Sequence, residues 1–281
     1  MKLLLGLILL GISAFTYGQE SSAEIADAEK NSLLKTASSL YAEGKYSATV
    51  EELKTVEETQ KSKLSKPLSG FISYWKAICY NKNQDFPQAI ANLDKALGLD
   101  YAPVDINYEY GQALFAAEKL SEARLQFRES LKKKFKRAVS LYYIAYISKE
   151  LGEKKKAVTF YKAIEKLDAA EAMEVRQASE MQIGDIYLEQ VEKHPDAFKA
   201  VESYVIPQYK KALELNRDSA LAPEIQNKIY KLENKYDLVL FKLRNGRPTL
   251  NPPYFLRLAA EYGVDSNVTF SPTEQDRKSV V

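Results

Sequence analysis

The chain has 281 residues, and its 40 Lys and Arg nearly balance its 38 Asp and Glu, so a net charge of +2 offers no electrostatic basis for binding nucleic acid. Its single cysteine, Cys79, excludes an internal disulfide and a metal site built from several cysteines, and its single histidine, His194, argues against a His-based metal cage or catalytic triad. The chain has only 11 Gly and 10 Pro, whereas Ala, Leu, Lys and Glu are common. This composition favours a mostly helical protein.

The N-terminus has the pattern of a secretory signal peptide. Lys2 precedes an apolar run from Leu3 to about Phe15, and small and polar residues follow. A run of about 13 residues is short for a membrane-spanning helix, which needs about 20; an uncleaved signal anchor is the alternative. We expect cleavage after Gly18, so that residues 1–18 are the signal peptide, residues 19–30 an N-terminal linker, and the mature chain is exported.

Three segments with one pattern follow each other at a spacing of 34 residues, beginning at Phe71, Asp105 and Val139. Each has a small residue in its first half, a second small residue twelve positions later, and a large apolar residue one helical turn after that. These residues are Ala77, Gly111 and Ala145, then Ala89, Ala123 and Ala157, then Leu93, Phe127 and Tyr161. A strict period of this length is the signature of a solenoid whose stacked units share a core.

The pattern resembles the tetratricopeptide repeat family, whose unit is a helix-turn-helix of 34 residues with small residues where helices A and B cross. A diverged earlier copy has Thr49 in place of the usual alanine, a later copy contains Gly184, and residues 222–243 are interpreted as a capping helix. The resemblance implies an all-α fold: a right-handed tetratricopeptide-type solenoid of about five helix pairs plus the capping helix over residues 31–246. A short β-like or disordered C-terminal tail is expected after it.

A tyrosine stands three residues before the first small residue of each segment. In the family, this position and those one and four residues after the small residue face the concave groove, so the resemblance implies a peptide-binding groove. Tyrosine suits docking because it combines a large contact area with a hydroxyl group and a low entropy cost. The alternative is that these rings pack between repeats without any ligand. The predicted groove residues are Tyr74, Ile78, Tyr108, Gln112, Phe115, Tyr142 and Tyr146.

Beyond Gly246 the pattern changes. Pro248, Pro252 and Pro253 end the helical region, and from residue 256 to 265 apolar and polar residues alternate. This alternation, preceded by two aromatic residues, is the strand signature of an outer-membrane barrel. It resembles the junction in bacterial proteins that carry a periplasmic tetratricopeptide domain ahead of such a barrel. Residues 247–281 are therefore expected to form a Pro-containing linker and a single strand-like tail, with outer-membrane association through residues 254–268.

A single strand in lipid cannot satisfy the hydrogen-bonding groups of its backbone. Three explanations stay open: the chain is a truncated relic, its strand adds to another protein's sheet, or its tail is soluble.

We expect no enzyme, cofactor or metal site, because the sequence has no glycine-rich phosphate loop, nucleophile elbow or spaced carboxylate pair. The leading hypothesis is an exported, periplasmic, non-enzymatic scaffold that binds an extended segment of a protein or peptide partner in the cell envelope. The alternative is the periplasmic domain of an outer-membrane secretion or export barrel whose pore is truncated or supplied by another chain.

Overall fold

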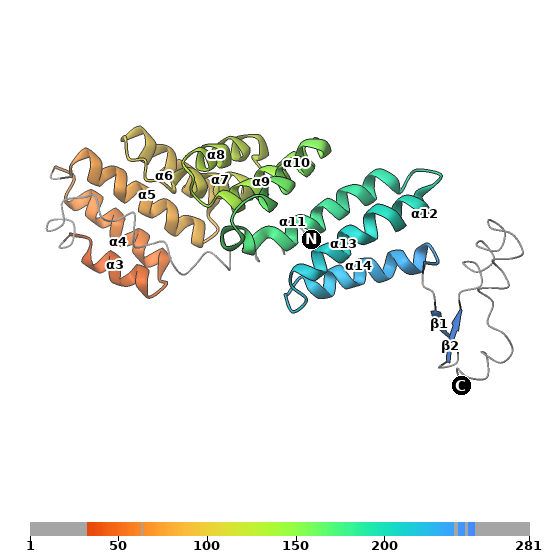
Figure 1. The fold of residues 1–281 in the computed structure, drawn as a ribbon. Helices are drawn as coiled ribbons and strands as arrows, with labels where there is room; N and C mark the ends of the chain where they lie inside the picture. The colour runs from red at the N-terminus through yellow and green to blue at the C-terminus, as the bar shows by residue number, and fades with distance from the viewer. Residues whose placement is uncertain (1–32, 63, 239–240, 245–246, 251–281) are drawn as a thin grey trace, which may run out of the picture. The chain divides into compact units, whose positions relative to one another are not determined.

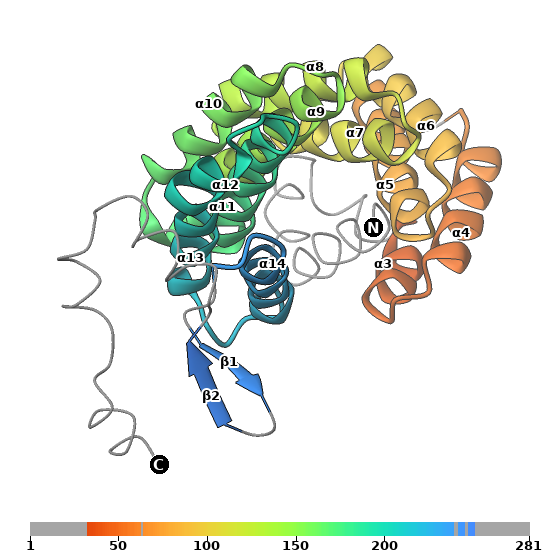
Figure 2. The same cartoon turned by 90° about the vertical axis from the view of Figure 1, so that its right-hand side faces the viewer.

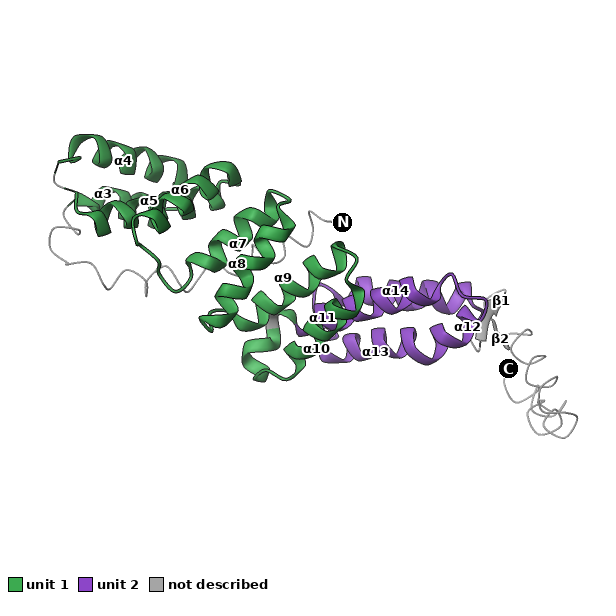
Figure 3. Cartoon of the chain, turned by 90° about the horizontal axis from the view of Figure 1, so that it is seen from above, with its two compact units in different colours: residues 1–175 green, residues 176–281 purple. Residues whose placement is uncertain are grey.

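The structure is a computed structural model that describes residues 33–62, 64–238, 241–244 and 247–250. It divides into two compact units, residues 1–175 and residues 176–281, shown in green and purple in Figure 3. Each unit is considered by itself. The expected signal peptide (1–18), the linker (19–30) and the strand-like segment (254–268) lie outside the described residues.

Unit 1 is built from helix pairs that follow one another along the chain (Figure 1). Each first helix, or A helix, packs on the B helix after it and also on the B helix of the preceding pair. Figure 2 places α5, α7 and α9 on the inner side of the curve of this unit and α6, α8 and α10 on its outer side. The expected tetratricopeptide-type solenoid of helix pairs is thus confirmed. The pairs are α3 (Lys35–Ala42) with α4 (Tyr46–Thr59), α5 (Lys66–Lys82) with α6 (Phe86–Gly98), α7 (Ile106–Ala116) with α8 (Leu120–Lys132), and α9 (Arg137–Glu150) with α10 (Lys154–Glu165).

The backbone of the turns repeats with the same period as the side chains. After every A helix one residue adopts a left-handed conformation: Gly44 (φ 73°), Gln84 (62°), Glu118 (60°) and Gly152 (80°). Glycine takes this conformation without steric strain, whereas other residues lose about 1–2 kcal/mol. The chain therefore reverses direction in the same way in each pair, even where the turn residue is not glycine.

The small and large residues that define the repeat meet in the core. All three large residues and all the alanines of the pattern are buried. The approach is close at Gly111, where an added Cβ would lie 2.9 Å from Cδ1 of Phe127. Phe127 in turn stacks flat on Tyr143 of the next A helix, with ring centroids 4.4 Å apart. Thr49 replaces an alanine without leaving a buried polar atom unpaired, because its hydroxyl donates to the carbonyl of Lys45 at 3.0 Å.

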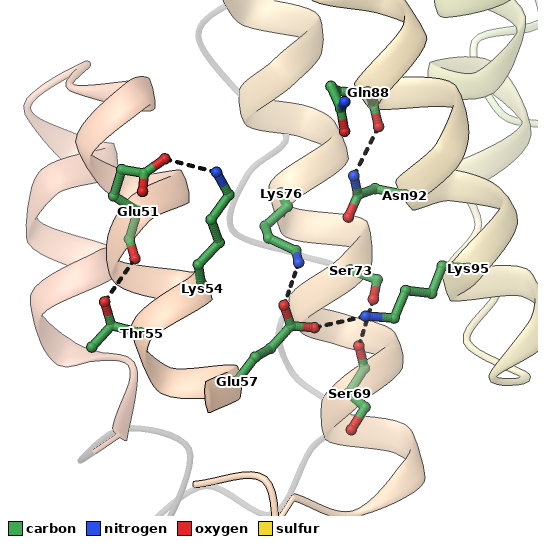
Figure 4. A network of polar contacts seen from close by, with 10 residues as sticks. All are labelled: Glu51, Lys54, Thr55, Glu57, Ser69, Ser73, Lys76, Gln88, Asn92 and Lys95. Atoms are coloured by element: carbon green, nitrogen blue, oxygen red, sulfur yellow. Dashed lines mark hydrogen bonds and ion pairs between the residues drawn. The ribbon is translucent and has the colours of Figure 1, made fainter. Parts of the chain in front are cut away.

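A buried ion pair joins the first two helix pairs (Figure 4). The ammonium of Lys76 on α5 is buried and binds Glu57 of α4, and Glu57 also accepts from Nζ of Lys95 on α6 at 3.0 Å. Burial acts to raise the pKa of Glu57, but the two ammonium groups outweigh it and the pKa is lowered. Lys76 is thus paired, as a buried charge must be.

Unit 2 contains most of the long helix α11 (Ala169–Val191), which begins in unit 1. Its B-type helix is continuous, formed by α12 (Ala197–Ala200), the π-helical turn η1 (Val201–Val205) and α13 (Ile206–Leu215), and α14 (Ala222–Lys235) packs on α13. The π turn ends two residues before Pro207, whose ring would clash with a carbonyl in a regular α-helix and which has no N–H to donate. An added Cβ on Gly184 would lie 2.6 Å from the ring of Tyr209, so the small-against-large contact recurs here.

The helix expected over residues 222–243 ends earlier than predicted. It stops at Lys235, Asp237 adopts a left-handed conformation (φ 52°), and β1 (Phe241–Arg244) then pairs antiparallel with β2 (Arg247–Leu250). In the register, Phe241 lies opposite Leu250 and Arg244 opposite Arg247. The residues between the strands in the sequence are Asn and Gly, the dipeptide most typical of a two-residue hairpin turn. That signal outweighs the helical pattern of the preceding residues.

We predict that Gly111→Ala lowers the free energy of unfolding by about 1–3 kcal/mol. The added methyl group must displace Phe127, which is held against Tyr143. Urea denaturation followed by circular dichroism measures the change. Gly98→Ala is the matched control, because an added Cβ at Gly98, in the last turn of α6, meets no atom within 4 Å. Equal stability of the two variants would contradict the close crossing at Gly111.

Candidate functional site

The tyrosines predicted to line a groove lie in the core of unit 1. Tyr74, Tyr108 and Tyr142 are 5%, 1% and 1% exposed, and Ile78 is also buried. Of the predicted residues, Gln112, Phe115 and Tyr146 are half-buried and reach the surface. The structure thus separates the predicted set into buried and accessible members, and the three repeated tyrosines take the packing role that the sequence left open as the alternative.

Each buried tyrosine has contacts that explain its position. The hydroxyl of Tyr74 donates to Oδ2 of Asp105 at 2.7 Å. Tyr108 packs edge-on against Phe127 and Phe135, and its hydroxyl accepts from Nε2 of Gln112 at 3.0 Å. The ring of Tyr142 meets that of Tyr161, the large residue of the same repeat, with centroids 5.5 Å apart. These rings hold A helices to their neighbours.

Half-buried side chains follow one another along the A helices of unit 1. We call the set Asn81, Glu109, Gln112, Phe115 and Tyr146 the inner strip. Asn81 on α5 donates from Nδ2 to the carbonyl oxygen and to Oε2 of Glu109 on α7, at 3.2 and 3.3 Å. Phe115 on α7 meets Tyr146 on α9 edge-on, with ring centroids 5.7 Å apart. Contacts between strip residues therefore run from α5 to α7 and from α7 to α9.

Two carboxyl groups on α7 give the strip its electrostatic character. Asp105 is buried, at 8% exposure, and Glu109 lies one turn further along the same face. Burial raises the pKa of Asp105 against the opposing effects of the Tyr74 hydrogen bond and of Lys133 and Lys136. Burial, together with the charge of Asp105, also raises the pKa of Glu109.

The sequence-based prediction missed Asp105 and Glu109. Glu109 directly follows Tyr108, and the prediction considered the repeated tyrosine but not its acidic neighbour. A useful signal was present: Asp105 and Glu109 are four residues apart and therefore share a helical face. That Asn81 of the preceding A helix meets this face became visible only in the structure.

The cysteine and the histidine show no feature of a reactive site. Cys79 is fully buried, and burial raises the pKa of its thiol to about 12, so the unreactive protonated form prevails. His194 lies in an exposed turn, where its Nδ1 accepts from the backbone N–H of Asp196 at 3.2 Å. In the part of the chain that the structure describes, no group of three His, Cys, Asp or Glu side chains is placed to hold a metal ion. None of the described helices combines the length and the apolar character needed to cross a membrane.

No protein-family model and no curated protein matches the chain. Among solved structures, the fold is similar to that of YrrB, described as a TPR protein with an unusual peptide-binding site, with 16% identity over 71% of this chain and 95% of that chain and a TM-score of 0.53. It is also similar to the MamA protein, with 16% identity over 75% and 97% of the two chains and a TM-score of 0.51. Human IFIT1, solved as a dimer with PPP-AAAA, is 17% identical over 73% of this chain and 47% of its own, with a TM-score of 0.52. These likenesses show a tetratricopeptide-type fold.

We predict that Tyr108→Ala lowers the free energy of unfolding by about 3–5 kcal/mol, because it removes a fully buried ring. Tyr146→Ala, at a half-buried position of a neighbouring A helix, should cost about 1 kcal/mol. Thermal and urea unfolding of both variants provide the comparison. A Tyr108→Ala protein as stable as the wild type would show that this ring is not part of the core.

Proposed function

We propose that the chain is an exported, non-enzymatic scaffold that binds an extended polypeptide segment along the inner strip and so takes part in protein–protein interaction in the cell envelope. The observation that carries the proposal is the inner strip itself. It offers an amide, a carboxylate and aromatic rings on three successive A helices, on the inner side of the curve of unit 1. These groups can bind both the backbone and the side chains of a bound segment.

The spacing of the helices suits an extended ligand. Packed helices lie about 8–10 Å apart, and an extended chain advances about 3.3 Å per residue. About every third residue of a bound segment would therefore face a new A helix. A segment of about seven to nine residues would cross α5, α7 and α9. The peptide-binding site described for YrrB supports the proposal only as a property of another protein with this fold.

The binding test begins with a displayed library of random peptides about 12 residues long, selected against the full chain. We predict that peptides are enriched and that Tyr146→Ala weakens their binding about tenfold, since buried aromatic contacts dominate such interfaces. Fluorescence anisotropy with a labelled enriched peptide measures the dissociation constant. Tyr230→Ala on α14 is the matched control, because Tyr230 is 65% exposed and lies outside the strip. If no peptide is enriched, or if both variants bind equally well, the strip is not the binding site.

Export is proposed from the N-terminal sequence, which lies outside the described residues. Lys2 and the apolar run from Leu3 to about Phe15 support a cleaved signal peptide and a periplasmic location. We predict that a C-terminal fusion to alkaline phosphatase is active in a bacterium with two membranes and that the mature chain begins at Gln19. Removal of residues 1–18 should abolish the activity. An active fusion without these residues would contradict export by this segment.

The alternative function is the periplasmic domain of an outer-membrane secretion or export barrel whose pore is truncated or supplied by another chain. It rests on the alternating residues 254–268, which lie outside the described residues. Fractionation of the same cells separates the two proposals. Recovery of the chain with the outer membrane, and its release when residues 254–281 are deleted, would favour the alternative.

A further inference from the structure

Asp105 occupies a position that normally caps a helix, yet its side chain does not cap α7. It is the N-cap residue, and its carboxylate makes no hydrogen bond to the first turn. Oδ2 accepts from the hydroxyl of Tyr74, and Oδ1 is buried without a hydrogen-bond partner among the described residues. A capping aspartate stabilises a helix by about 1 kcal/mol. This side chain is instead turned toward Tyr74 of α5.

The same region holds a second unused acceptor and a second carboxylate. Oδ1 of Asn81 is also buried without a partner among the described residues, while its Nδ2 binds Glu109. The charges of Lys82 and Lys136 act to lower the pKa of Glu109, and those of Lys133 and Lys136 act to lower the pKa of Asp105, against the larger effect of burial. Carboxylates offer only acceptors when ionised. The unpartnered oxygens of Asn81 and Asp105 therefore lack a hydrogen-bond donor.

Leaving a buried carboxylate such as that of Asp105 without a paired cation costs stability. Glu57, by contrast, binds two lysines. Two classes of cation suit clustered oxygens: a hard metal ion and an organic cation that donates hydrogen bonds. The described residues offer no arrangement of three ligands for a metal ion. Charge complementarity therefore favours an ammonium or guanidinium group.

We propose that Asn81, Asp105 and Glu109 select a lysine or arginine side chain of the extended segment bound along the inner strip. The inference rests on the proposed function, because the cation arrives as part of that segment. Half-buried Glu109 and Asn81 contact the cationic group, and Asp105 behind them adds negative charge. The half-buried rings of Tyr41 and Trp75 on the preceding helices, with centroids 5.8 Å apart, offer an apolar surface for the aliphatic stem of the ligand.

The peptides enriched from the random library test the inference. We expect a lysine or arginine at one fixed position and about a tenfold loss of affinity when norleucine replaces it. Glu109→Gln should weaken the cationic peptide by about the same factor and leave the norleucine peptide unaffected. Glu58→Gln, the same change at an exposed position of α4, is the matched control and should bind both peptides like the wild type.

The outcomes separate this inference from the proposed function. Enriched peptides without a preferred cation, bound equally by Glu109→Gln, would overturn the inference and leave the scaffold function intact. Failure to enrich any peptide would overturn the proposed function and, with it, this inference.

A stability measurement distinguishes selection of a cation from a structural role of Glu109. The pKa of Glu109 is higher in the folded than in the unfolded chain. As pH rises, Glu109 therefore loses its proton in the unfolded state first, and the free energy of unfolding falls between the unfolded-state pKa and the folded-state pKa. Glu109→Gln keeps an acceptor for Asn81 and removes this fall, so its melting temperature at pH 7 should equal or exceed that of the wild type. A lower melting temperature together with unchanged peptide preference would assign Glu109 to the framework and overturn the inference.

Discussion

Phe127 fills the space that Gly111 leaves open and lies flat against Tyr143, and the rest of unit 1 depends on close crossings of this kind. A small residue on the A helix lets its B helix approach, and in the case of Phe127 the large residue of that B helix also reaches the next A helix. The contact of Gly184 with Tyr209 repeats the first half of this arrangement in unit 2. Because interiors are close-packed, the volumes at these positions set the spacing of the A helices and hence the spacing of the inner strip.

This packing decides which tyrosines are available to a ligand. The three repeated tyrosines are buried and pack against neighbouring helices: Tyr74, Tyr108 and Tyr142. Only side chains on another face of each A helix are half-exposed. The accessible surface is consequently more polar than a column of tyrosines would be. It combines Asn81, Glu109 and Gln112 with aromatic rings at the α7–α9 end.

Carboxylates that are largely covered in the described structure differ in how they are paired. Glu57 in unit 1 and Asp185 in unit 2 each accept from two donors; Asp185 binds Nζ of Lys228 at 2.7 Å and the hydroxyl of Tyr209 at 2.6 Å. Such fully paired groups join helices at little cost. Asp105 and Glu109 differ, because burial raises the pKa of both and Oδ1 of Asp105 has no hydrogen-bond partner among the described residues. Residues that lower stability in this way commonly serve a functional site.

The sequence by itself determined the class of fold, because a period of 34 residues in small and large positions admits stacked helix pairs and little else. It also marked the residues of the close crossings, such as Gly111 and Phe127, by size alone. It could not assign Tyr74, Tyr108 and Tyr142 to a face, since side chains that pack between repeats and side chains that face a ligand recur with the same period. Only the tertiary structure decided this, because burial depends on what the next helix covers. For the same reason, only the fold brought Asn81 of one helix pair to Glu109 of the next, 28 residues along the chain.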